Sequence, residues 1–67
     1  MNQQIYVRSQ LNRILYDLVG SWELVDVWWY SSNKALAGMA PNDVYWSGEE
    51  GRRQVADYIL KHANGVY

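Results

Sequence analysis

Apolar and polar residues alternate along the first part of the chain with the period of an α-helix. Apolar side chains recur there at spacings of three, four and seven residues, which places them on one face of a helix. Gly20 then interrupts the pattern. We therefore predict an amphipathic helix over about residues 3–19. Its apolar positions are Ile5, Val7, Leu11, Ile14, Leu15, Leu18 and Val19.

A second apolar stretch follows a helix-capping residue. The Ser21 hydroxyl can accept a hydrogen bond from a free amide of the first turn, and the positive end of the helix dipole favours Glu23 in that turn. The β-branched and aromatic residues of the same stretch also suit a β-strand. We predict a helix over about residues 22–30 and keep the strand as the alternative. The residues at helical spacing are Leu24, Val25, Trp28 and Trp29.

A connector of turn-forming residues separates this element from a short third one. Residues 31–34 are polar, and Gly38 and Pro41 punctuate the segment that follows. Proline suits the first position of a helix because it has no N–H group, and an N–H at that position would have no acceptor within the helix. We predict a short helix over about residues 41–46. Its inward-facing residues are expected to be Val44 and either Tyr45 or Trp46.

The last predicted helix begins with a capping box. The Ser47 hydroxyl would accept from the Glu50 amide, and the Glu50 carboxylate would accept from the Ser47 amide. We predict a helix over about residues 48–63, ended by a left-handed cap at Asn64 and Gly65. Its inward positions are Val55, Tyr58, Ile59 and His62, and positive charge at Lys61 and His62 suits its last turn.

These elements predict an all-α fold, a small bundle of three to four helices in a single domain spanning residues 1–67. Cysteine is absent, so disulfides and thiolate metal sites are excluded and hydrophobic burial must supply the stability. A chain of 67 residues is near the lower limit for independent folding. We therefore also expect a homodimer, because association would add to a marginal core.

The aromatic content exceeds what so small a core needs. The chain has four Trp and six Tyr and is 49% hydrophobic. Some of these rings must lie at the surface, where Trp and Tyr are enriched in protein interfaces. The formal net charge is -1, whereas a protein that neutralises phosphates normally has a basic excess. The composition therefore favours a protein partner over nucleic acid, and it argues against a helix-turn-helix reading of the paired helices.

No segment reads as a signal peptide or a membrane span. Residues 1–4 are polar after Met1, and charged residues interrupt the apolar positions that follow. The most apolar run, residues 24–30, contains Asp26 and is far shorter than the roughly 20 residues that cross a bilayer. We expect no membrane partner and a cytoplasmic location.

Candidate chemical groups are few and scattered. His62 is the single histidine, and without a second histidine or a cysteine it forms no recognisable metal site or nucleophilic pair. The acidic residues Glu49, Glu50 and Asp57 are better explained by capping and a solvated helix face, and no glycine-rich phosphate loop is present. No set of residues meets the requirements for nucleophile, base and oxyanion donors. We therefore expect no enzyme activity, no cofactor and no metal.

Two adjacent arginines carry a possible contact. Arg52 and Arg53 point in different directions from one helix, so a shared anion clamp is less natural than two separate contacts. We expect one of them to pair with Glu49 on the solvated face and the other to contact a partner.

Three segments in the second half of the chain carry a family resemblance. They are N-K-A-L-A-G-M-A-P-N-D-V at residues 33–44, E-G-R-R-Q-V at residues 50–55 and G-V-Y at residues 65–67. In their order and spacing they resemble the toxin-binding domain of Xre/MbcA/ParS-type antitoxins, over roughly residues 21–67. The resemblance implies an antitoxin that silences a RES-domain toxin, an enzyme that consumes NAD. It would assign Gly65, Val66 and Tyr67 to blocking the toxin's active-site entrance and Arg52 to supporting them.

One departure from the family limits what is carried over. Its members usually have an N-terminal helix-turn-helix domain, and the first 20 residues here are too few to form one. We therefore expect a stand-alone or truncated module, or a related fold used for another partner, and no promoter autoregulation.

The sequence thus predicts a protein-binding module that neutralises a partner protein. The alternatives are a phage-type inhibitor of a host protein and a self-associating structural subunit that pairs through residues 3–19. The predicted partner-binding residues are Trp29, Trp46, Arg52, Gly65, Val66 and Tyr67.

Overall fold

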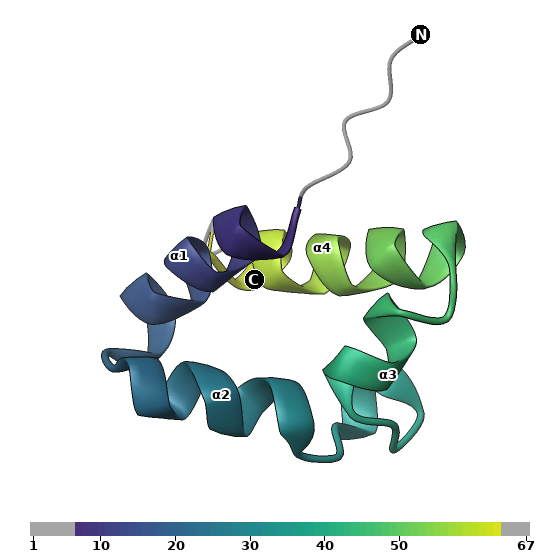
Figure 1. The fold of residues 1–67 in the computed structure, drawn as a ribbon, viewed down its shortest axis with the longest axis horizontal. Coiled ribbons are helices and arrows are strands. Elements are labelled where there is room, and N and C mark those ends of the chain that lie inside the picture. Colours follow the sequence, from purple (N-terminus) through teal and green to yellow (C-terminus); the bar gives the residue numbers. More distant parts are fainter. Residues whose placement is uncertain (1–6, 64–67) are drawn as a thin grey trace, which may run out of the picture.

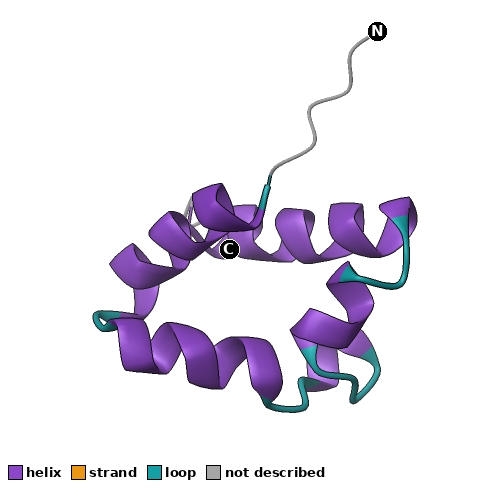
Figure 2. Ribbon diagram, viewed as in Figure 1, coloured by secondary structure: helices purple, strands orange, loops and turns teal. Residues whose placement is uncertain are grey.

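The computed structural model describes residues 7–63, which form four α-helices and one 3-10 turn (Figure 1). The elements are α1 (Arg8–Val19), α2 (Trp22–Tyr30), η1 (Lys34–Leu36), α3 (Pro41–Tyr45) and α4 (Glu49–Ala63). Residues 7–63 contain no strand (Figure 2). The all-α prediction is confirmed, and the strand alternative for residues 22–30 is wrong.

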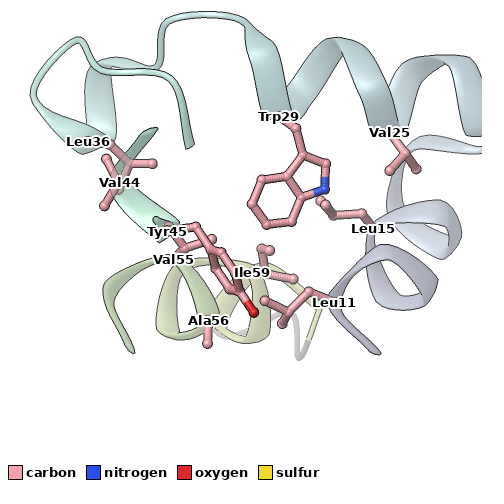
Figure 3. Close-up of a cluster of buried hydrophobic side chains, with 10 residues drawn as sticks. All are labelled: Leu11, Leu15, Val25, Trp29, Leu36, Val44, Tyr45, Val55, Ala56 and Ile59. Atoms are coloured by element: carbon pink, nitrogen blue, oxygen red, sulfur yellow. The ribbon is translucent and has the colours of Figure 1, made fainter. Parts of the chain in front are cut away.

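The four helices surround a single core. α1 lies beside α4, α2 contacts both α1 and α3, and α3 packs on α4 (Figure 1). Every element contributes apolar side chains to this core (Figure 3). Its members are Leu11, Leu15, Val25, Trp29, Leu36, Val44, Tyr45, Val55, Ala56 and Ile59.

Helix α1 starts at Arg8, later than the predicted start near residue 3. Val7 has an extended backbone, with φ -81° and ψ 162°. Its amide donates to Oε1 of Gln10 instead of entering a helical turn. The predicted residues before Val7 lie outside the described range. The end of α1 is as expected, because Gly20 adopts φ 90° and donates to the Tyr16 carbonyl.

Helix α2 has the predicted cap. The Ser21 side chain accepts from the Leu24 amide at 3.1 Å, which satisfies one of the free donors of the first turn. Val25 and Trp29 are buried, one turn apart on the face that meets the core.

The connector between α2 and α3 is a closed loop built around Asn33. Its side chain accepts from the Ala35 amide at 2.9 Å, and its backbone pairs with Met39 across the loop. Ala37 and Gly38 have positive φ values of 61° and 80°. Hydrogen bonds among residues a few positions apart therefore close this loop, and its Leu36 side chain belongs to the core.

Helix α4 does not begin with the predicted capping box. The Ser47 hydroxyl donates to the Val44 carbonyl at 2.6 Å, and the Glu50 carboxylate lies 3.8 Å from the Arg53 guanidinium. The Ser47 amide also donates to the Val44 carbonyl, at 3.1 Å, so both polar groups of Ser47 close the end of α3 instead of opening α4. Helix α4 starts at Glu49, and the predicted cap at residues 64 and 65 lies outside the described range.

The last turn of α4 contains the two basic residues that were predicted there. Lys61 and His62 lie in it, beside the negative end of the helix dipole. Nδ1 of His62 lies 3.0 Å from the Tyr58 carbonyl, so this ring is part of the helix end.

Candidate partner-binding surface

Helices α3 and α4 meet at a very close backbone contact. A Cβ atom added to Gly51 would lie 1.9 Å from the Val44 carbonyl oxygen and 2.5 Å from the Ser47 hydroxyl. Only glycine permits this approach. The glycine of the G-R-x-x-V segment therefore sets how near α4 lies to the end of α3, and with it the position of the residues on either side of the junction.

An aromatic side chain projects from this junction. Trp46 follows α3 directly and is 63% exposed. Its ring lies edge-on to Tyr45, with centroids 5.1 Å apart and planes at 85°. Of the two aromatic residues predicted to face inward as alternatives, Tyr45 is the buried one. The buried Tyr45 ring thus supports an exposed indole in an edge-to-face arrangement.

Arg52 contributes a positive charge to the same place. Its guanidinium carbon lies 6.0 Å from the centroid of the Tyr45 ring, at the outer limit of a cation–π contact. The structure therefore brings two of the predicted partner-binding residues, Trp46 and Arg52, close to the ring of the same tyrosine. We call Tyr45, Trp46 and Arg52 the α3–α4 corner.

Trp29, a third predicted contact residue, lies in the core. It is 1% exposed, and its Nε1 donates to Oδ1 of Asn12 at 2.6 Å. Its ring lies edge-on to Tyr45 at 5.6 Å. The placement of Trp29 on a binding surface is therefore wrong, because α2 directs this indole inward. Its role is to pack behind Tyr45 and so support the corner from within (Figure 3).

The other arginine of the pair has a different environment. Arg53 lies 3.8 Å from Glu50, and both side chains are well exposed. One arginine of the pair thus lies beside an acidic residue as expected, but that residue is Glu50, one position after the predicted Glu49. Glu50 and Arg53 have the i,i+3 spacing that brings two side chains of a helix together. Such an exposed pair adds at most about 1 kcal/mol to stability.

Large apolar side chains are exposed at several other positions of the described structure. The residues that are between 43% and 63% exposed are Val7, Leu18, Trp22, Leu24, Val27, Tyr30, Met39 and Trp46. Four of them belong to α2, and three of these four, Leu24, Val27 and Tyr30, recur at a spacing of three. The surface therefore has two separate apolar features, the α3–α4 corner and the outer side of α2.

A shallow apolar hollow of about 280 Å³ lies between α1, α2 and α4. On one side of it the rings of Trp28 and Tyr58 stack, with centroids 6.1 Å apart. Leu18 and His62 also line it.

Two further findings concern the described residues alone. No group of three or more His, Cys, Asp or Glu side chains among residues 7–63 is placed to hold a metal ion, and no helix in that range is long and apolar enough to cross a bilayer.

The predicted contact residues Gly65, Val66 and Tyr67 lie outside the described range. Sequence reasoning missed the supporting role of Tyr45 and the packing role of Gly51. A signal for Gly51 was present, since a glycine inside a helix costs about 1 kcal/mol relative to alanine and usually has a packing reason. Nothing in the local sequence indicates that Tyr45 is the buried residue and Trp46 the exposed one.

Comparisons of the chain with protein-family models, with curated proteins and with solved structures found no match.

Proposed function

We propose that this chain is a protein-binding module that neutralises a partner protein, and that the partner is a RES-type NAD-consuming toxin. The observation that carries the protein-binding part is the α3–α4 corner, where an indole that is 63% exposed rests on a buried tyrosine ring. The class of partner comes from the family resemblance. A toxin that consumes NAD acts in the cytoplasm, so the proposal places the chain there.

The corner has the properties of a binding hot spot. Trp, Tyr and Arg are the residues most enriched among those that dominate binding energy, and the corner is made of these three types. Tyr45 is 4% exposed and packs against both Trp29 and Trp46. Because the Trp46 ring is already supported, it loses little freedom when a partner covers it, which lowers the cost of binding.

Neutralisation would follow from covering the partner's active site. The resemblance assigns that role to Gly65, Val66 and Tyr67, which follow α4 in the chain. In this proposal the α3–α4 corner supplies affinity and the three terminal residues supply inhibition. The two contributions can be separated by measurement.

The test uses the intact chain with a RES-domain protein from its native host. We expect Trp46→Ala to weaken binding by at least about 30-fold, corresponding to the 2 kcal/mol or more of a hot-spot residue, as measured by calorimetry. Leu18→Ala is the matched control, because Leu18 is also exposed but lies on α1, away from the corner. Removal of residues 65–67 should abolish inhibition of NAD consumption.

The result would contradict the proposal in either of two ways. If the chain captures an unrelated host enzyme and ignores the RES-domain protein, it is an inhibitor of the phage type. If it binds only itself, and gel filtration shows that Trp46→Ala leaves this association unchanged, it is a self-associating subunit.

A further inference from the structure

Helix α2 has apolar residues on its exposed side as well as on its buried side. All but two of its nine residues, Glu23 and Asp26, are apolar or aromatic. The side of a surface helix that faces away from the core is normally polar, so apolar residues there call for an explanation. In the described structure one side of α2 meets the core, through the buried Val25 and Trp29 and the partly buried Trp28.

The opposite face is open and its apolar residues are aligned. Successive residues of a helix are about 100° apart, so Val27 lies about 160° around the axis from both Val25 and Trp29. Val27 is 56% exposed. Leu24 and Tyr30, three residues before and after it, are 49% and 61% exposed. They form a stripe along the side of α2 that faces away from the core.

Acidic residues accompany this stripe. Glu23 and Asp26 are both exposed, and among residues 7–63 neither lies within salt-bridge distance of a basic side chain. Arg8 is near one end, where it donates to the Tyr30 hydroxyl at 3.3 Å. Its guanidinium is already held by Asn42 at 2.7 Å. We call Glu23, Leu24, Asp26, Val27 and Tyr30 the α2 outer face.

Charge disfavours a second copy of this chain on the α2 outer face. A twofold dimer presents the same patch twice, so the carboxylates of both copies would meet without a basic side chain from either helix. In an antiparallel pair centred on Val27, the two Asp26 side chains would be neighbours across the axis. Like charges placed together in an interface disfavour association. A partner of opposite charge is better suited to this face.

We infer that the α2 outer face docks a basic amphipathic helix of a partner protein. The apolar stripe of that helix packs on Leu24, Val27 and Tyr30, which recur at the spacing that helix pairing uses. Lysine or arginine side chains flanking its stripe face Glu23 and Asp26. This inference goes beyond the proposed function, because it concerns α2 and does not depend on the α3–α4 corner.

The experiment uses a synthetic peptide that forms an amphipathic helix of about five turns, with leucine on one face and lysine on its flanks. Fluorescence anisotropy should show that the intact chain binds it, and that Val27→Asp lowers the affinity by at least about tenfold. The double variant E23Q/D26N should weaken binding and reduce its dependence on salt. The matched control E49Q/E50Q changes the net charge equally but on α4, and it should leave binding unchanged.

Three results would overturn the inference. One is equal binding of a peptide in which glutamate replaces the lysines. Another is equal weakening by E49Q/E50Q and E23Q/D26N, which would show a general charge effect. The third is self-association that Val27→Asp dissolves in sedimentation experiments. Circular dichroism checks the fold of each variant, and Leu24→Lys replaces Val27→Asp if that variant unfolds. Trp46→Ala should leave peptide binding intact, which separates this test from that of the α3–α4 corner.

Discussion

Asn33 closes the loop between α2 and α3 with its own side chain. The side-chain oxygen of Asn33 accepts from the Ala35 amide at 2.9 Å. The backbone carbonyl of Asn33 accepts from the amides of both Leu36 and Gly38. The side chain thereby replaces a backbone partner at the start of a short turn. This local role was readable from the polar and glycine pattern of the connector, since it depends only on residues a few positions apart.

We predict that Asn33→Ala lowers the free energy of unfolding by about 1 kcal/mol, the usual cost of a lost capping side chain. Urea denaturation followed by circular dichroism measures it. Ser32→Ala is the control, because Ser32 is an exposed neighbour. Equal midpoints for the two variants would show that the Asn33 side chain does not hold the loop.

Other features of single residues were not readable. Trp28 and Trp29 are adjacent aromatic residues, and so are Tyr45 and Trp46. The two members of such a pair point in different directions, but the sequence does not show which of them faces the core. Which ring is buried depends on where the neighbouring helices lie. For this reason Trp29 was wrongly placed on the surface, while it is 1% exposed in the structure.

At the scale of elements, the junction of α3 and α4 depends on Gly51. The helix carries this glycine in its first turns, where the α3 backbone passes too near for a side chain. The same junction explains why the capping box fails. The Ser47 hydroxyl donates to the Val44 carbonyl of α3. The local sequence pattern had predicted that this hydroxyl would cap α4.

We predict that Gly51→Ala destabilises the chain by about 1–3 kcal/mol or more, the range for overpacked sites. Alanine favours helix by itself, so a loss of stability isolates the steric effect. Gln54→Ala on the exposed side of the same helix is the control. Thermal unfolding measures both, and a Gly51→Ala variant as stable as the control would mean that α4 can move away from α3 without cost.

At the scale of the whole molecule, Arg8 connects three helices. It starts α1, donates to Asn42 in α3 at 2.7 Å and to Tyr30 in α2 at 3.3 Å. Its guanidinium carbon also lies 4.1 Å from the Trp29 ring centroid. These contacts join segments that are up to 34 positions apart in the sequence. They therefore stabilise the arrangement of the helices relative to one another and not any one helix.

We predict that Arg8→Met lowers the free energy of unfolding by about 1–2 kcal/mol, because it removes charged hydrogen bonds and the contact with the indole face. Tryptophan fluorescence during urea unfolding measures this change. Arg13→Met serves as the control, since Arg13 is an exposed residue of α1. The assignment would be contradicted if both variants unfolded at the same urea concentration.

The sequence by itself determined the helical class, the element order and most element boundaries. Helical period, the Ser21 cap, Gly20 and Pro41 act through residues within one or two turns, and such short-range effects are present in the sequence pattern. The tertiary structure alone decided which aromatic rings are buried, why Gly51 must be glycine and where the Ser47 hydroxyl binds. It also decided that the α2 outer face is open. These outcomes depend on contacts between distant segments, and the pattern of one helix does not specify what packs against it.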